Sequence, residues 1–158
     1  MGFFSKFFGK KEAKIKPAIL VKNLAQDLFL SAADIEKWKK LDELIVIGKV
    51  LEVLAHPDPQ ITKVKITKVD IGTGKPVQIL CGGSNIAIDQ IVPVATLEAK
   101  LSDEFVISVR EIRGEESFGM ICSRRELGLS LAKERAGEIW VLPASFESFV
   151  GKPLCILL

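Results

Sequence analysis

Hydrophobic and polar residues alternate in short stretches from residue 44 onward, and alternation with a period of two is typical of half-buried β-strands. Most of these stretches are separated by glycine-, proline- or asparagine-containing segments, which favour turns. The pattern predicts about five strongly bent strands and a short last one, over residues 44–56, 62–72, 77–81, 90–97, 104–113 and 138–143. We therefore expect an all-β domain. Periodicity leaves open whether it is a small barrel or a sandwich, since both use short alternating strands.

The second predicted strand does not keep a strict period of two. Ile66 and Val69 are both apolar but lie three positions apart, which predicts a β-bulge near Thr67. In this interpretation the apolar residues point inward. Lys63 and Lys65 then point outward, on the same face of the strand.

The positions of the glycine and proline residues predict further details of the strands and turns. Gly48 lies inside the first strand and predicts a sharp bend or bulge, and Pro93 predicts an edge or irregular strand. Gly72 and Gly74 predict a hairpin turn rather than a phosphate-binding loop, because no Ser or Thr follows the next lysine. The fifth strand is expected to point three side chains inward: Phe105, Ile107 and Val109.

Two short helical elements are also predicted. Ser31 and Asp34 fit a capping box, followed by apolar residues at a spacing of three, namely Ile35, Trp38 and Leu41. Gly128 is expected to close a helical turn that begins at Arg124. Residues 17–30 are apolar without a clear period, so the pattern does not place them.

The net charge of +2 is unevenly distributed. Residues 1–43 hold nine lysines and six acidic residues, a net charge of +3, whereas the rest holds 13 basic and 14 acidic residues, a net charge of −1. The main body is not basic as a whole. Any site for an anion there must come from a local arrangement of charges.

The residues available for catalysis or metal binding are few. The chain has one histidine, His56, and three widely spaced cysteines, Cys81, Cys122 and Cys155, so no usual zinc-binding spacing is present. We expect the cysteines to be buried free thiols in a reducing cytoplasm and His56 to be a structural turn residue. The sequence predicts no metal, no cofactor and no enzymatic activity.

The first 16 residues combine aromatic and basic side chains. At helical spacing, the stripe is formed by Phe3, Phe4, Phe7 and Phe8, with Lys6, Lys10 and Lys11 beside it. One interpretation is a short interfacial helix in weak contact with an anionic membrane surface, which would make the protein peripheral to the membrane. A disordered tail and a helix docked on the domain are the alternatives.

Several motifs follow one another over residues 44–143. They are Ile47–Val53 with His56-Pro57, then "KVDIGTG", "VQILCGGSNI", "VPVATL" and "IRGEESFGMICSRRELGLS" at 112–130. In this order they resemble the tRNA-binding domain near the N-terminus of the bacterial phenylalanyl-tRNA synthetase beta subunit, and also stand-alone tRNA-binding proteins. The loop at Asp58–Thr62 departs from the family's usual Asn-Ala-Asp-Lys-Leu.

The resemblance implies a five-stranded OB-fold barrel that recognises tRNA mainly by its shape. Residues 44–158 would form this domain, preceded by an extension with a short helix at 17–43 and the basic, Phe-rich tail at 1–16. The expected protein is a free-standing, non-catalytic, cytoplasmic tRNA-binding module, and a homodimer would double its contacts. The alternative is an interaction module or secretion-type chaperone of the same fold, near a membrane through residues 1–16.

RNA recognised by shape offers phosphates and 2′-hydroxyls, and the groups suited to bind it are cations, hydroxyl groups and an exposed aromatic ring. The candidates are Lys63, Lys65, Asn85, Arg110, Arg113, Ser117, Phe118, Ser123, Arg124 and Arg125. Structural roles remain open for several of them. Asn85 is equally suited to capping a turn. Arg113 could instead pair with Glu115 or Glu116. Arg125 could instead pair with Glu126 or Glu134.

Overall fold

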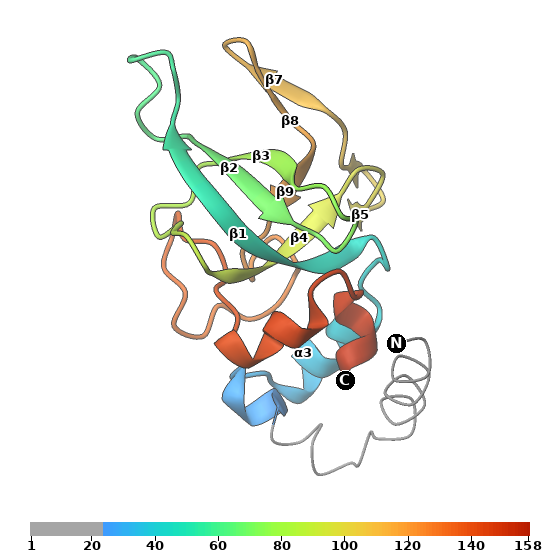
Figure 1. Cartoon of the computed structure of the whole chain (residues 1–158). Coiled ribbons are helices and arrows are strands. Elements are labelled where there is room, and N and C mark those ends of the chain that lie inside the picture. Colours follow the sequence, from blue (N-terminus) through green and yellow to red (C-terminus); the bar gives the residue numbers. More distant parts are fainter. Residues whose placement is uncertain (1–23) are drawn as a thin grey trace.

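The computed structural model describes residues 24–158 (Figure 1). Its elements are the helix α3 (Ala32–Lys39), the strands β1 (Ile45–Ala55), β2 (Lys65–Asp70), β3 (Val77–Cys81), β4 (Ile91–Thr96), β5 (Lys100–Ser102), β6 (Phe105–Val106), β7 (Arg110–Ile112), β8 (Glu115–Ser117) and β9 (Gly119–Ile121), and the 3₁₀-helices η1 (Ala144–Phe149) and η2 (Leu154–Leu157). The predicted tail at 1–16 lies outside the described residues. Within residues 24–158, no helix has the length and apolar character needed to cross a membrane.

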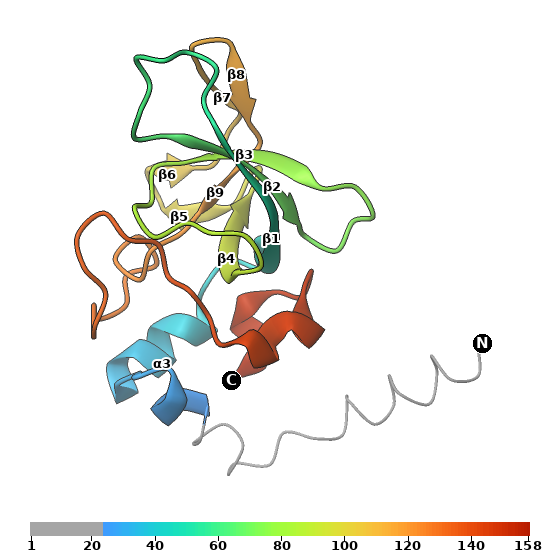
Figure 2. The ribbon, with the colours of Figure 1, turned by 60° about the vertical axis from the view of Figure 1, so that its left-hand side comes forward.

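Five antiparallel strands in the order β3-β2-β1-β4-β9 curl into a nearly closed barrel (Figures 1 and 2). Its two end strands meet at a seam between β3 and the β8–β9 segment. The amide of Phe118 donates to the Gln78 carbonyl (2.9 Å), and the Ser117 hydroxyl accepts from the Leu80 amide (3.0 Å). The predicted all-β, five-stranded OB-fold is confirmed, and the barrel is favoured over the sandwich.

The bulge lies in β1 and not, as predicted, near Thr67 in β2. The pairing of β1 with β2 shifts by one residue between Val50 and Glu52. Thr67 is fully buried. Its hydroxyl donates to the Ile79 carbonyl (2.7 Å), so this polar residue is tolerated at an interior position. Lys65, two positions away, therefore lies on the same strand face as Thr67 rather than pointing outward, and it is half-buried.

Gly48 is required by close packing. A Cβ at this position would lie 2.7 Å from a methyl group of Val94 and 2.8 Å from one of Val69. The neighbouring strands can therefore approach β1 closely only because residue 48 has no side chain.

Pro93 lies in a central strand, so the prediction of an edge strand was wrong. β4 pairs with β1 on one side and β9 on the other. The residue opposite Pro93 is Ile47, whose backbone N–H donates to Lys152 and whose carbonyl accepts from Gly151. The proline therefore removes no hydrogen bond from the β1–β4 ladder.

Two further strand predictions were only partly correct. The segment 104–113 divides into β6 and β7, and Val109 between them is 46% exposed, although Ile107 is buried as expected. The segment 138–143 forms one isolated bridge, between Leu142 and Ile91, rather than a strand.

Two arms stand beyond the barrel: the β1–β2 loop and the β7–β8 hairpin (Figures 1 and 2). His56 joins them. Its Nδ1 accepts from the Asp58 amide (3.0 Å), so Nε2 carries the proton and donates to the Ile112 carbonyl (2.8 Å). The predicted structural role of His56 is confirmed, and both of its ring nitrogens are engaged.

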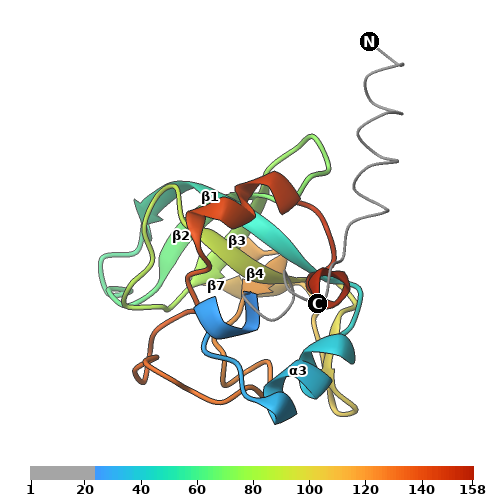
Figure 3. The ribbon, with the colours of Figure 1, turned by 90° about the horizontal axis from the view of Figure 1, so that it is seen from below.

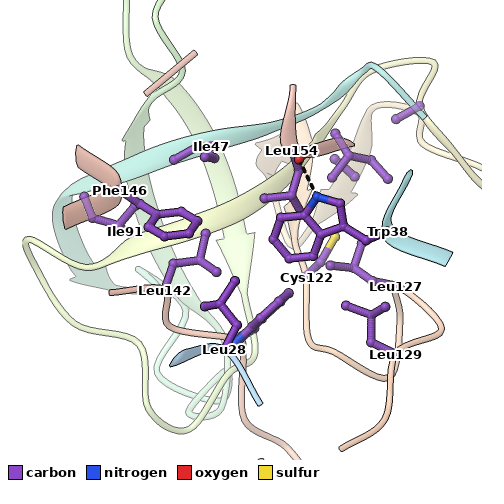
Figure 4. Packing of buried hydrophobic residues seen from close by; sticks show 14 of the residues in the cluster. Leu28, Trp38, Ile47, Ile91, Cys122, Leu127, Leu129, Leu142, Phe146 and Leu154 are labelled. Carbon is purple, nitrogen blue, oxygen red and sulfur yellow. Dashed lines mark hydrogen bonds between the residues drawn. The ribbon is translucent and has the colours of Figure 1, made fainter. Parts of the chain in front are cut away.

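A second layer covers the lower end of the barrel. Here α3 packs against η2, as Figure 3 shows from below, and η1 packs against β1 and β4. Ser31 and Asp34 form the predicted capping box on α3. Trp38 is fully buried, packs edge-to-face on Trp140 (5.7 Å between ring centroids) and donates to the Leu154 carbonyl (2.7 Å; Figure 4). The residues from 24 onward thus share a hydrophobic core with the barrel and the C-terminus.

Candidate nucleic-acid interface

A cleft of about 420 Å³ opens beside the barrel seam. Its walls come from the end of β3, from β6 and β7, from β8–β9, and from the segments 123–126 and 131–139. The apolar part of the lining includes Phe105, Val106, Met120, Leu131 and Ile139. The volume lies in the range of about 300–1,000 Å³ that is usual for sites that hold small molecules.

Three arginines line this cleft: Arg110, Arg125 and Arg135. All three are exposed, and none forms an ion pair within residues 24–158. The Arg110 guanidinium lies 5.6 Å from the centroid of the Phe105 ring, so one cation and one aromatic face meet in the same wall.

Three carboxylates also line the cleft, and each already accepts hydrogen bonds. Glu134 receives the backbone N–H of Arg124 at 3.0 and 2.9 Å, and Glu138 receives that of Arg135 at 3.1 Å. Glu126 receives the Ser123 hydroxyl at 3.0 Å. Partial removal of the Glu126 carboxyl from water raises its pKa, although the hydrogen bonds from Ser123 oppose this effect. The guanidinium groups, by contrast, remain available to an incoming anion.

Arg124 is buried and holds the fold together. Only 3% of it is exposed, and its guanidinium donates to the carbonyls of Ser130 (2.5 Å), Leu28 (2.5 Å) and Phe29 (3.0 Å). It lies over the Trp140 ring at 4.8 Å. The candidate contact of Arg124 with RNA would require this network to break, so Arg124 belongs to the interior and not to the exposed surface.

Asp34 completes that network from the N-terminal side. Its carboxylate lies 3.8 Å from the Arg124 guanidinium and accepts hydrogen bonds from the Ser130 amide (2.8 Å) and hydroxyl (2.5 Å), and from the Ser31 amide (2.9 Å). Burial alone would raise the pKa of Asp34. The hydrogen bonds from Ser130 and Ser31 outweigh burial and lower it to about 2.

Three other polar candidates are engaged within the protein. The Ser117 hydroxyl closes the seam and donates to the Gly119 carbonyl (3.0 Å). The Ser123 hydroxyl caps the following turn by accepting the Glu126 amide (3.2 Å). The Asn85 side chain donates to the Ile139 carbonyl (3.0 Å) and accepts from the Ile139 amide (2.8 Å). These bonds support structural roles.

The remaining candidates lie on exposed or half-buried surface. Arg113, at the tip of the β7–β8 hairpin, pairs with Asp58 at 3.8 Å and not with the adjacent glutamates that the sequence suggested. Lys63 is exposed in the β1–β2 loop, and Phe118 is 37% exposed. The expected pairing of Arg125 with Glu126 or Glu134 does not form, since no such ion pair occurs in the described part of the chain.

The cleft therefore brings together Arg110, Ser117, Ser123 and Arg125 from the ten candidates. Sequence reasoning missed Arg135 and Phe105. Arg135 lies in a charged loop without a motif, and Phe105 was assigned to the interior, so no local signal identified either.

The thiols and metal-binding residues offer little further chemistry. Cys81 and Cys122 are buried as predicted, and burial raises the pKa of both thiols, whereas Cys155 is only half-buried. Among residues 24–158, no group of three or more His, Cys, Asp or Glu residues is arranged to hold a metal ion.

Comparison with known proteins agrees with this geometry. The family described as "Putative tRNA binding domain" matches residues 45–148. The phenylalanine–tRNA ligase beta subunit of Geobacillus kaustophilus is 42% identical over 132 residues, which cover 80% of this chain and 16% of that protein. The same subunit of Chlorobium luteolum is 43% identical over 130 residues, covering 80% of this chain and 15% of that protein.

A solved structure, the C-terminal domain of Plasmodium vivax p43, matches 52% of this chain and 46% of that chain at 25% identity, with a TM-score of 0.40. The chain spans about one sixth of the length of the curated relatives it matches. Because the family match extends over the whole barrel and both walls of the cleft, this chain belongs to the tRNA-binding domain family.

Proposed function

We propose that this chain is a non-catalytic module that binds tRNA by its folded shape, through the barrel surface around the cleft. The observation that supports it is the family match over residues 45–148, which includes the cleft arginines. Double-stranded RNA presents phosphates and 2′-hydroxyls rather than an accessible major groove, so a protein that recognises its shape needs cations fixed on a stiff surface. The barrel supplies that stiffness.

The arrangement of cations fits this function. Arg110, Arg125 and Arg135 can each make two parallel hydrogen bonds to a phosphate, as a planar guanidinium allows. Lys63 and Arg113 extend the surface onto the two arms. Since the main body carries almost no net charge, attraction to RNA depends on these positions and is reduced strongly by salt.

A non-catalytic role is consistent with the candidate chemical groups. Both ring nitrogens of His56 form hydrogen bonds within the fold. The Cys81 and Cys122 thiols are buried with raised pKa values, which makes them poor nucleophiles. The predicted membrane contact of residues 1–16 lies outside the described residues, and the homodimer stays a prediction.

Filter binding of bulk tRNA over a range of salt concentrations tests this proposal. We expect tRNA to bind at least tenfold more tightly than a plain RNA duplex of similar length. Replacing Arg110, Arg125 and Arg135 together by glutamine should reduce the slope of log affinity against log salt by roughly 2–3, about one for each phosphate that is no longer neutralised.

The matched control replaces three exposed lysines that do not line the cleft, Lys39, Lys40 and Lys75, by glutamine. This variant has the same change in net charge and should keep most of the affinity. Equal decreases in affinity for the two triple variants, or equal binding of tRNA and plain duplex, would count against the proposal.

A further inference from the structure

The cleft has the wrong shape for a helix but a suitable one for a single nucleotide. Its volume of about 420 Å³ cannot admit stacked base pairs, and the cations are placed along its lining rather than on a flat face. Resting on the function proposed above, we infer that the cleft takes one unstacked nucleotide of an RNA loop or end, with the base inside and the neighbouring backbone phosphates on the arginines.

The wall of the cleft offers a cation–aromatic pair on which a base can stack. Phe105 and the Arg110 guanidinium lie together at 5.6 Å, and unstacked bases pack on aromatic rings and on guanidinium planes. Met120 and Ile139 provide further apolar surface in the same lining. A base that leaves its stack in RNA would regain comparable packing here.

The rim supplies the complementary charge. Arg125 and Arg135 line the cleft from the segments that follow the barrel, and neither is ion-paired within residues 24–158. The three carboxylates in the lining accept hydrogen bonds from the protein's own backbone or from Ser123, which holds them in place. This charge pattern favours a nucleotide over an apolar peptide, which would leave the guanidinium groups without a partner.

One glycine allows the cleft to be filled without disturbing the fold. Gly82 lines the cleft and has no left-handed backbone angle. Among the described residues outside its two chain neighbours, no atom lies within 4 Å of the position that a Cβ would occupy. Gly82→Leu should therefore obstruct the cleft while leaving the arginines unchanged. Ala87→Leu adds the same side chain to the same exposed loop outside the cleft and is the matched control.

The test uses the full chain and a single-stranded RNA pentamer with 2-aminopurine at its centre, compared with the same pentamer lacking that base. Because stacking of one base on an aromatic side chain contributes about 1–3 kcal/mol, the base should raise affinity by roughly fivefold to more than a hundredfold. Wild type and Ala87→Leu should show this difference, and Gly82→Leu should lose it. Ala136→Leu, a second cleft-lining change, should behave like Gly82→Leu if that variant proves unstable in a thermal melt.

The outcomes separate this inference from the proposed function. If all variants bind tRNA but none distinguishes the pentamer from its abasic form, the cleft holds no base and the inference is wrong while the function stands. If the base-dependent difference is present but tRNA binds no better than plain duplex, the function is wrong instead. Tighter binding of an apolar peptide than of the pentamer, abolished by Gly82→Leu, would assign the cleft to a protein partner and overturn the inference.

Discussion

Arg124 and Arg125 are neighbours in the chain, but their side chains lie in two different regions of the molecule. Arg124 is buried in the layer below the barrel, where it forms hydrogen bonds with carbonyl groups almost a hundred residues away in the chain. Arg125 is exposed on the lining of the cleft without an ion partner in residues 24–158. The same residue type thus stabilises the fold at one position and is available to a ligand at the next.

The largest effect on stability is expected for Arg124→Met. This change leaves the carbonyls of Leu28 and Ser130 and the Asp34 carboxylate without their cation. Removing one partner of a buried ion pair usually lowers the free energy of unfolding by about 3–5 kcal/mol. Urea denaturation followed by tryptophan fluorescence would measure it. A decrease below about 1 kcal/mol, the usual range for exposed ion pairs, would show that the network contributes little.

Acid should weaken the same network through Asp34. Its pKa in the folded state, about 2, lies below the ordinary value of 3.8, so ionised Asp34 stabilises the fold above pH 4. That contribution, about 1–2 kcal/mol, is lost as the pH falls from about 4 to about 2. Unfolding measured across this range should show a steeper loss of stability in wild type than in Asp34→Asn, which has no carboxyl to titrate. Parallel curves for the two proteins would contradict the assignment.

Arg125→Gln should change stability least, by no more than about 0.5 kcal/mol, because substitutions at exposed positions usually have small effects. Affinity for tRNA should nevertheless fall about three- to tenfold, and the salt slope by about one. Lys75→Gln, which removes an exposed charge away from the cleft, is the control. If Arg125→Gln leaves affinity unchanged but destabilises the protein, the contrast between the two arginines is wrong.

The sequence predicted the fold where local patterns determine the structure. Alternation located β1 and β3 closely, and Ser31 with Asp34 located the start of α3 through its capping box. Thr67 and Pro93 misled the prediction because distant partners settle their positions. The carbonyl of Ile79 makes a buried threonine favourable, and bonds between Ile47 and the C-terminal segment make a central proline tolerable.

The candidate site was predictable only in part for the same reason. Nothing in a run of two arginines shows which one a distant segment will bury, and the carbonyls that bind Arg124 come from residues 28 and 29. Arg135 lies on the cleft lining close to the loop at 137–139, which Ser84 and Asn85 hold against the barrel. Such interactions join segments that are far apart in the chain, and the local sequence does not predict them.

The bonds at the barrel seam determine how easily β3 separates from the β8–β9 segment. β3 and the β8–β9 segment are joined there by the Phe118 amide and by the side chains of Ser117 and Gln78 rather than by a regular backbone ladder. Separating these strands therefore breaks fewer backbone hydrogen bonds than separating β1 from β2 or β4. The cleft is lined from both sides of this junction. A molecule that binds only when both sides of the junction are in place would therefore stabilise the closed barrel against separation of these strands.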